Sequence, residues 1–379
     1  MGMQQEHAYK KTFDTVVIGG GVVGMSLAYG LSRAGERVLL LDEGDDAYRA
    51  ARGNFGLVWV QGKGSGNPAY ARWTMAAAAQ WPGFAAELKD RTGVDVELSQ
   101  AGGLTLCIDD GELEKKVRSL RSLREQLHEH YAFDVLDQRR LKELIPQVGD
   151  RIAGAVMCPL DGHVSPLKLL RALFQAYESA GGVLVSGMKV EHIHPQSPGG
   201  FLVDTGAARF AGAKLVLAAG LGNRQLAPMV GLEAPVVPIR GQIMVSERMA
   251  PFLEYPTLHV RQTREGVVQI GDSKEDVGMD DGTTLDQLSR IAARAMRCFP
   301  LLGNVNIVRT WGALRVMSPD GYPIYQASRD CPGAFVVTCH SGITLAPQHA
   351  GQVADWIRAG AEPADMAGFK AERFHVQAH

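Results

Sequence analysis

A glycine-rich loop between a β-branched run and a helical pattern constrains this chain more than any other feature. Residues 13–18, FDTVVI, predict a buried parallel strand, and residues 23–35, VGMSLAYGLSRAG, predict a helix that begins in the loop. Residues 37–44, RVLLLDEG, predict a second strand that ends at Asp42. A strand, loop, helix and strand in this order indicate a doubly wound α/β fold.

The glycines of the loop occupy the positions of a GxGxxG pattern. Gly19 permits a tight turn, Gly21 lets the backbone approach a pyrophosphate, and Gly24 lets helix and strand pack closely. Asp42 follows Gly24 by 18 residues (42 − 24), close to the spacing at which an acidic side chain binds the ribose. The pattern therefore predicts dinucleotide binding. A glycine turn without a ligand would explain neither Asp42 nor the order of strand, loop, helix and strand around it.

The residues after the second strand distinguish FAD from NAD, which share this pattern. A long glycine-rich stretch follows at 48–68, where an NAD domain usually continues with another helix and strand. Such backbone can lie along an extended, flat ligand. Two later segments, 181–193 and 213–226, predict further strands, and the second contains small residues, Ala219 and Gly220, that permit close approach to a bound molecule. A binding domain assembled from separated segments favours FAD.

Size and composition set broader limits. A chain of 379 residues exceeds one typical domain, and its 46% hydrophobic and 21% charged residues are ordinary for a globular protein. The net charge of −2 favours neither nucleic acid nor an anionic membrane as a partner. No apolar run reaches the roughly 18 residues of a membrane span, and no secretory signal is visible. A cytoplasmic location is expected, with attachment to a membrane through an electron acceptor left open.

Metal binding is not expected. The five cysteines include no CxxC pair, which argues against zinc, a ligated iron–sulfur cluster or a disulfide framework. His192 and His194 share a predicted strand face, and His128 and His130 lie close together, but neither pair has a third ligand nearby.

Four landmarks in order resemble the D-amino-acid oxidase, glycine oxidase and sarcosine oxidase superfamily of flavoproteins. They are VVIGGGVVGMSLAYGLSRAG…LLLDEG, LVLAAGLGN, PIRGQIMV and WGALRVMSPDGYPIY…AFVVTCHSGITLAP. ARGNFGLVWVQGKG and TCHSGITLAP look most similar to the β subunits of opine oxidases and D-hydroxyproline dehydrogenases. The resemblance covers nearly the whole chain. It implies an α/β fold with a discontinuous, Rossmann-like FAD domain (1–90, 151–232 and 312–379) and a smaller substrate domain with a mixed or antiparallel sheet (91–150 and 233–311).

By position, the resemblance implies a cofactor site. Asp42 would bind the adenosine ribose, and the backbone near Val190 would meet the adenine. Arg52 and Asn54 fall where the family contacts the pyrophosphate and passes the flavin ring. Because Gly312 and Ala313 stand near the place where relatives with covalent flavin have a cysteine, noncovalent FAD is expected. The residues expected at FAD are Gly19, Gly21, Val22, Val23, Gly24, Asp42, Glu43, Arg52, Gly53, Asn54, Phe55, Gly56, Val190, Ala219, Gly220, Gly342, Ile343 and Thr344.

The last three of these residues would present backbone N–H groups to the pyrimidine edge of the flavin. The segment ITLAPQHAGQVADWIRAG at 343–360 predicts a helix, whose first turn offers unpaired N–H groups to the negative charge of the reduced ring.

Arg315 occupies the place where relatives hold the substrate carboxylate, and a guanidinium can bind a carboxylate through two hydrogen bonds. A surface or domain-interface salt bridge is the plain alternative. Two departures from the family put the substrate's identity in doubt. Val316 stands where relatives often have proline, and CHSGITLAP is about two residues shorter than in glycine oxidase.

Other side chains have two interpretations each. His340 lies beside the predicted flavin loop and either tunes the site or is structural. His259, in the predicted strand TLHVRQT, and Tyr255 are candidates for the lining of the substrate cavity. The amphipathic pattern at 112–131 predicts a helix with a solvated face, which could also meet a partner subunit.

The leading hypothesis is a flavin amine dehydrogenase or oxidase. It would oxidise the Cα–N bond of a D-configured or secondary amino acid, such as D-hydroxyproline or an opine, by hydride transfer to flavin N5. The chain would bind a small amino acid and work with partner subunits or as a homo-oligomer. The alternatives are a self-sufficient oxidase of glycine, sarcosine or D-amino acids that uses O₂, and a flavin-carrying subunit without turnover.

Overall fold

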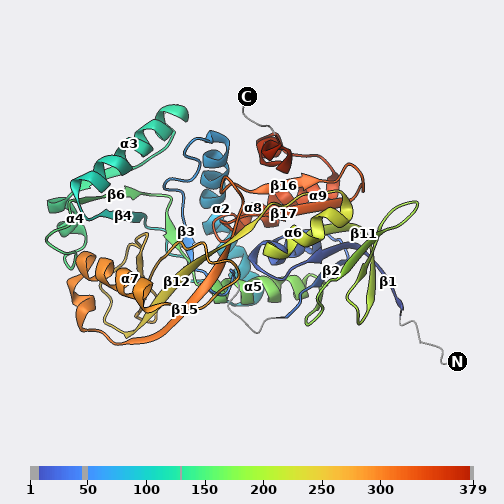
Figure 1. Cartoon of the computed structure of the whole chain (residues 1–379), viewed down its shortest axis with the longest axis horizontal. Coiled ribbons are helices and arrows are strands. Elements are labelled where there is room, and N and C mark those ends of the chain that lie inside the picture. Colours follow the sequence, from blue (N-terminus) through green and yellow to red (C-terminus); the bar gives the residue numbers. More distant parts are fainter. Residues whose placement is uncertain (1–7, 45–49, 129, 376–379) are drawn as a thin grey trace.

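An eight-stranded sheet organises one lobe of the molecule, and its central strands come from distant parts of the chain (Figure 1). The computed structural model describes residues 8–44, 50–128 and 130–375. β1 (Ala8–Ile18) lies between β2 (Val38–Leu41) and β11 (Arg209–Leu217), and all three run parallel. β17 (Ala334–Thr338) runs parallel to β11 on its other side. Where they pair, at 15–18, 38–41, 215–217 and 334–338, the strands are rich in Val and Leu and buried, as parallel strands between layers must be.

Shorter strands complete this sheet at its edges. β8 pairs with β2, β16 pairs antiparallel with β17, and β9 and β10 extend the sheet from β11. Their bounds are Val183–Val185 for β8, His192–Pro195 for β9, Phe201–Asp204 for β10 and Ile324–Ala327 for β16.

Helices from three regions pack together into a common core beside this sheet. Trp73, Trp81 and Trp356 fill that core with the apolar side of the first helix. The helices are α1 (Val22–Arg33), α2 (Pro68–Thr92), α5 (Pro166–Ser179), α8 (Ala346–Gln348), the π-helical η4 (His349–Val353) and α9 (Ala354–Ala359). A second core includes strand residues together with η1 (Gly220–Gly222), α6 (Asn223–Leu226), η2 (Ala227–Val230) and η6 (Ala371–Phe374), and η5 (Ala364–Phe369) contacts β16.

The other lobe contains a four-stranded antiparallel sheet and a three-stranded one, which share a core (Figure 1). The long strands β12 (Val237–Arg248) and β15 (Ile307–Met317) pair over most of their length. The four-stranded sheet is completed by β13 (Val260–Gln262) and β14 (Val267–Ile270), with α7 (Leu285–Cys298) and η3 (Pro300–Asn304) packed beside it. The three-stranded sheet has β4 (Gly103–Cys107), β5 (Asp134–Asp137) and β6 (Gly154–Cys158), with α3 (Asp110–Gln126) and α4 (Gln138–Leu144). β3 (Leu57–Val58) pairs with β7 (Gly162–His163).

The predicted mixed α/β architecture is confirmed, and the division into two domains stays a prediction. The predicted boundary at 151 assigns β6 to the FAD domain, although β6 pairs with β4 and β5 and not with the large sheet. The predicted boundary at 312 divides β15 between the two domains, although β15 pairs with β12 on both sides of that position.

Several predicted element limits were wrong. The strand predicted at 181–193 is two short strands, β8 and β9, and the helix predicted at 343–360 begins only at Ala346, after a turn. His259 precedes β13 by one residue and does not lie within a strand. The helix predicted at 112–131 ends at Gln126, because the backbone turns at His128, where φ is +52°.

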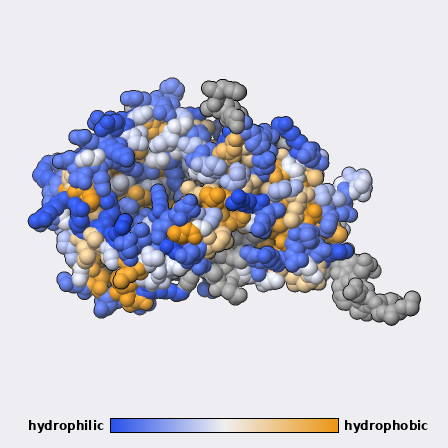
Figure 2. Space-filling model, in the orientation of Figure 1, coloured by the Kyte–Doolittle hydropathy of each residue, from blue (hydrophilic) through white to orange (hydrophobic). Residues whose placement is uncertain are grey.

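The surface offers two further observations. Within the described part of the chain, no helix is long and apolar enough to cross a bilayer. Apolar side chains gather at the lower left of Figure 2, where Figure 1 shows α7 and β15. Exposed large residues of these two elements are Leu285, Met296, Ile307 and Val308.

Candidate active site

The loop after β1 has glycine where a side chain could not fit. Gly19 has φ +107°, and a Cβ there would lie 2.5 Å from the carbonyl oxygen of Ala218. A Cβ on Gly24 would lie 1.8 Å from the carbonyl oxygen of Gly19, so the first turn of α1 and the loop touch through backbone. Glycine at these positions therefore lets β1, α1 and β11 converge.

The N-terminus of α1 is suited to an anion. Gly21 is its N-cap and supplies no side-chain cap, and the first turn, which includes Val22 and Val23, has no acidic residue. A Cβ on Gly21 would meet only the Ala51 side chain, at 3.8 Å. Unpaired N–H groups and the positive end of the helix dipole are thus left for a phosphate.

Asp42 holds the loop as well as facing the predicted ribose position. Its Oδ2 accepts a hydrogen bond from the Gly20 N–H (2.7 Å), and its Oδ1 accepts one from the Gly44 N–H (3.0 Å). A carboxylate has about four lone-pair positions, so hydroxyl donors can still bind. The Met188 N–H donates to the Asp42 carbonyl oxygen (2.9 Å), which brings the segment that leads to buried Val190 beside Asp42. Glu43 is exposed at this edge.

The predicted flavin-passing segment, 52–56, is clamped between elements of both lobes. The Gly53 carbonyl accepts a hydrogen bond from Trp311 Nε1 on β15 (3.1 Å). Asn54 Oδ1 accepts from the Gly56 N–H (2.7 Å), and a Cβ on Gly56 would lie 2.4 Å from the Val164 carbonyl oxygen.

Phe55 and Arg52, the other two residues of the 52–56 segment, differ in their surroundings. The guanidinium of Arg261 lies 5.8 Å from the centre of the Phe55 ring, whereas Arg52 is exposed.

The end of β11 meets the end of β15. The Ala219 N–H donates to Asn223 Oδ1 (2.9 Å), which fixes the turn after β11. Gly220 has φ +59°, and a Cβ there would lie 3.3 Å from the Val316 side chain. The residue next to Arg315 in β15 therefore packs against the predicted cofactor turn.

The turn before α8 leaves three consecutive N–H groups without an acceptor among the described residues: those of Gly342, Ile343 and Thr344. The turn itself is fixed, because the Leu345 N–H donates to the Ser341 carbonyl oxygen (3.0 Å). Thr344 Oγ1 accepts from the Trp59 N–H (3.1 Å). Buried N–H groups normally have partners, so this turn is built to donate hydrogen bonds to something bound.

Arg315 lies on β15 with its guanidinium over Gly241 of β12. A Cβ on Gly241 would come within 2.3 Å of Arg315 Nη2, so the glycine makes room for the guanidinium. The Arg315 guanidinium donates to Asp272 Oδ2 and to the Ser273 carbonyl oxygen. Burial alone would raise the pKa of Asp272, but His259 and Arg315 beside it hold that pKa below its ordinary value.

The other predicted catalytic residues are not all brought together. His259 Nδ1 lies 3.6 Å from Asp272 Oδ1, too far for a hydrogen bond, so the structure places His259 beside the Arg315–Asp272 pair without bonding it to that pair. Tyr255 packs on the core that the four-stranded and three-stranded sheets share. Within the described residues it makes no hydrogen bond to Arg315 or His259.

His340 lies within electrostatic range of Arg315. Its Nδ1 is buried and has no partner among the described residues. Burial and then the positive charges of Lys63 and Arg315 hold the pKa of His340 well below its ordinary value, so the imidazole is neutral at physiological pH.

Sequence reasoning missed a second polar group next to His340. Lys63 Nζ and the Tyr70 hydroxyl both donate to Ser341 Oγ, the latter at 2.9 Å. A lysine between two glycines in the apolar stretch WVQGKG was the one available signal. The buried Asp161 accepts from the Val60 N–H and holds this loop, and burial raises its pKa to about 7.

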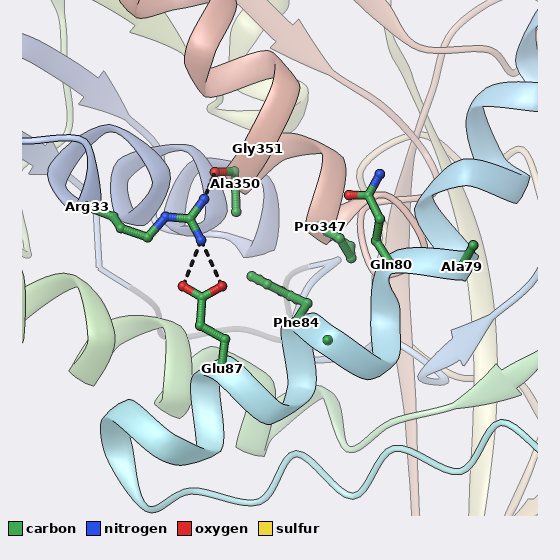
Figure 3. A pocket seen from close by; sticks show the side chains of 9 residues that line it. Arg33, Ala79, Gln80, Phe84, Glu87, Pro347, Ala350 and Gly351 are labelled. Atoms are coloured by element: carbon green, nitrogen blue, oxygen red, sulfur yellow. Dashed lines mark hydrogen bonds and ion pairs between the residues drawn. The ribbon is translucent and has the colours of Figure 1, made fainter.

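Figure 3 shows a surface pocket that lies apart from the predicted cofactor residues. It lies among α1, α2 and η4, where Arg33 makes two hydrogen bonds to Glu87 (2.7 and 2.8 Å) and one to the Ala350 carbonyl oxygen (3.0 Å). Its charges are thus paired within the protein, and no predicted cofactor residue lines it.

The strand-end residues fit a flavin dinucleotide. The glycine loop and the α1 N-terminus suit a pyrophosphate, and the unpaired N–H groups at 342–344 suit a polar ring edge. The sequence model of the family described as FAD dependent oxidoreductase matches residues 14–356. The chain belongs to this family. The predicted family and its cofactor, FAD, are therefore confirmed.

Individual members of the family resemble the chain over nearly its full length. The opine oxidase B subunit of Agrobacterium tumefaciens strain Ach5 is 42% identical over 365 residues, covering 96% of this chain and 98% of that protein. The protein of the same name from Rhizobium meliloti is 40% identical with the same coverage. The crystal structure of glycine oxidase from Geobacillus kaustophilus has a TM-score of 0.88 at 26% identity, covering 95% of this chain and 98% of that one.

Proposed function

We propose that the chain oxidises the Cα–N bond of a secondary or D-configured amino acid, typically an opine or D-hydroxyproline. The observation that carries this proposal is the position of Arg315. Its guanidinium lies at the end of β15, where the neighbouring Val316 packs at the predicted cofactor turn, and within electrostatic range of His340. A planar cation at this position suits the carboxylate of an amino acid.

In the proposed reaction, Arg315 holds the substrate carboxylate, since a guanidinium has five N–H donors and only part of them are used by Asp272 and Ser273. The unpartnered Nδ1 of neutral His340 can accept a hydrogen bond from the amine N–H. FAD, held by the glycine loop and the 342–344 turn, would supply the acceptor for the hydride that leaves Cα. The amine nitrogen loses its proton to solvent. Water hydrolyses the imine of an opine to a 2-oxo acid and an amine, whereas D-hydroxyproline gives a cyclic imine.

The turn at 342–344 would stabilise the negative charge of the reduced flavin. Its three N–H groups would donate to the polar ring edge of bound FAD and stabilise negative charge there, and the loss of one such donor costs on the order of 3 kcal/mol. The FAD is noncovalent in this proposal, because Gly312 and Ala313 offer no nucleophile. Acid precipitation should release all of the flavin into the supernatant.

We also propose that the chain works in a multi-subunit complex. Two relatives at 42% and 40% identity are each named as the B subunit of opine oxidase. The exposed apolar residues on α7 and the start of β15 support this proposal, because such clusters are typical of interaction surfaces.

Anaerobic reduction of the bound flavin tests the function. The FAD-loaded protein is mixed with a panel of opines, D-amino acids and N-substituted amino acids, and the loss of yellow absorbance is followed. We expect bleaching by at least one secondary or D-configured amino acid. Arg315→Ala should abolish it at ordinary substrate concentrations with FAD still bound. An Arg315→Ala protein that is reduced as readily as the wild type would contradict the proposal.

Two alternatives have an observation each in their favour. The likeness to glycine oxidase favours a self-sufficient oxidase, for which rapid peroxide formation by the chain alone in air would decide. The subunit name of the relatives favours a flavin carrier without turnover. That alternative gains if no amino acid bleaches the flavin of this chain while its assembled complex still turns over.

A further inference from the structure

Lys63 is a cation without a matching anion beside the candidate active site. Its ammonium donates to Ser341 Oγ, and among the described residues no carboxylate lies within ion-pair distance of it. Burial lowers its pKa to about 8, so most of the ammonium is still charged at neutral pH. The residue is only partly exposed and has no counter-ion among the described residues, so its ammonium is available to an anionic ligand.

Lys63 and Arg315 come from different elements, and the charges of both act on His340. Lys63 comes from the loop after β3 and ends on Ser341, the residue after His340. Arg315 comes from β15. The positive charges of both lower the pKa of His340, whose Nδ1 has no partner among the described residues. The neutral imidazole is therefore within electrostatic range of two cations, one from the loop after β3 and one from β15.

The hydrogen-bonding capacity of Lys63 is not used up in this arrangement. An ammonium has three N–H donors, and one of them is bonded to Ser341, which also accepts from Tyr70. Tyr70 and Ser341 thus hold the end of the lysine in one place, and the remaining donors can bind a carboxylate.

We propose that Lys63 binds a second carboxylate of the substrate, so that the site takes a secondary amine with a carboxylate on each side of its nitrogen. This inference rests on the proposed function. Arg315 holds the carboxylate on the carbon that is oxidised, His340 faces the N–H, and Lys63 holds the carboxylate of the other N-substituent. The substrate class is therefore an N-(carboxyalkyl) amino acid, and amino acids with a single carboxylate use only half of the site.

Ligand binding without turnover tests the inference. Thiodiacetate has two carboxylates around a thioether, (methylthio)acetate has one, and neither can be oxidised at a C–N bond. Binding to the FAD-loaded protein is followed by the change in flavin absorbance. Lys63→Met should weaken thiodiacetate by about 10- to 100-fold, the usual range for a charged hydrogen bond, and (methylthio)acetate by less than about twofold. Arg315→Lys should weaken both.

Two further variants serve as controls. Lys116→Met removes another cation, one near Asp161 and close to Gly62, and should leave the affinity for both ligands unchanged. Lys63→Arg keeps the charge and should retain part of the preference for thiodiacetate. FAD content, read from absorbance, shows that each variant is folded.

The outcomes separate the two proposals. Equal weakening of both ligands by Lys63→Met, or no weakening of either, overturns the second carboxylate site. If the wild type is then still reduced by amino acids with one carboxylate, the proposed function stands. If no amino acid reduces the wild-type flavin, the proposed function fails, and the substrate class fails with it.

Discussion

Gly241 leaves room for the Arg315 guanidinium, and replacing Gly241 tests whether the position of that guanidinium matters for substrate binding. In Gly241→Ala the new methyl group would lie 2.3–2.5 Å from the guanidinium atoms, so the flexible end of Arg315 must move. We expect KM for the amino acid to rise by about 10-fold or more, from the loss of a charged hydrogen bond, with FAD content unchanged. Steady-state kinetics measure this. Gly351→Ala, at a position with open space, is the control and should behave as wild type.

Lys63 predicts a pH dependence for ligands with two carboxylates. The groups whose charges reach it are Cys339, Lys274, Asp161 and Arg315. Since burial lowers its pKa to about 8 and only the protonated form attracts a carboxylate, affinity for thiodiacetate should fall as pH rises above 8. (Methylthio)acetate affinity should change less over the same range. Titrations from about pH 7 to pH 9.5 measure both, and identical pH profiles would contradict the assignment.

The single residues differ in how far sequence could predict them. The sequence could propose Arg315 and the 342–344 turn as site residues because each lies in a short motif that fixes its position, and their roles stay predictions. Lys63 was not, because its partner Ser341 is 278 residues away and only the folded chain joins them. Asp272 was missed for the same reason, since it is recognised only through its contact with Arg315.

At the scale of elements, the crossing of β1 and α1 predicts a sharp result for Gly24. A Cβ there would overlap the Gly19 carbonyl at 1.8 Å, and backbone cannot move aside as a side chain can. Gly24→Ala should therefore lose FAD and unfold at lower temperature. Gly83→Ala in α2 meets nothing within 4 Å and should instead stabilise the protein by about 0.5–1 kcal/mol, as expected for glycine in a helix interior. Flavin absorbance and thermal unfolding check both; retention of FAD by Gly24→Ala would be evidence against the site.

Periodicity predicted β1, α1 and β2, whose buried faces are continuous in sequence. It could not predict that β6 joins the three-stranded sheet, because strand partners are chosen by packing between distant segments. The π-helical turn at His349–Val353 was equally invisible, since its apolar spacing is that of an ordinary helix.

For the molecule as a whole, two buried histidines predict how stability depends on pH. Burial lowers the pKa of His163, with help from Arg261, and that of His349, each to about 3. The unfolded chain binds protons at these positions below about pH 6.5 and the folded chain does not. Their contribution is therefore present above pH 6.5 and is lost as pH falls toward 3, by up to about 1.4 kcal/mol per pH unit for each.

Urea unfolding of the wild type and of His349→Gln between about pH 4.5 and 7 measures this contribution. The variant should show a slope of unfolding free energy against pH that is smaller by about 1 kcal/mol per unit. Asp161, whose pKa burial raises to about 7, acts in the opposite sense but equally in both proteins. Parallel curves would show that His349 takes up a proton in the folded state.

The central sheet joins strands in an order that differs from the order of their synthesis. β17 pairs with β11, and the turn at 342–344 follows β17 directly. While a ribosome is still adding the last third of the chain, β11 has an open edge and the ring-side donors do not yet exist. Because these last segments complete the site, we expect stable retention of the coenzyme only after the C-terminal third has been synthesised and has paired with β11.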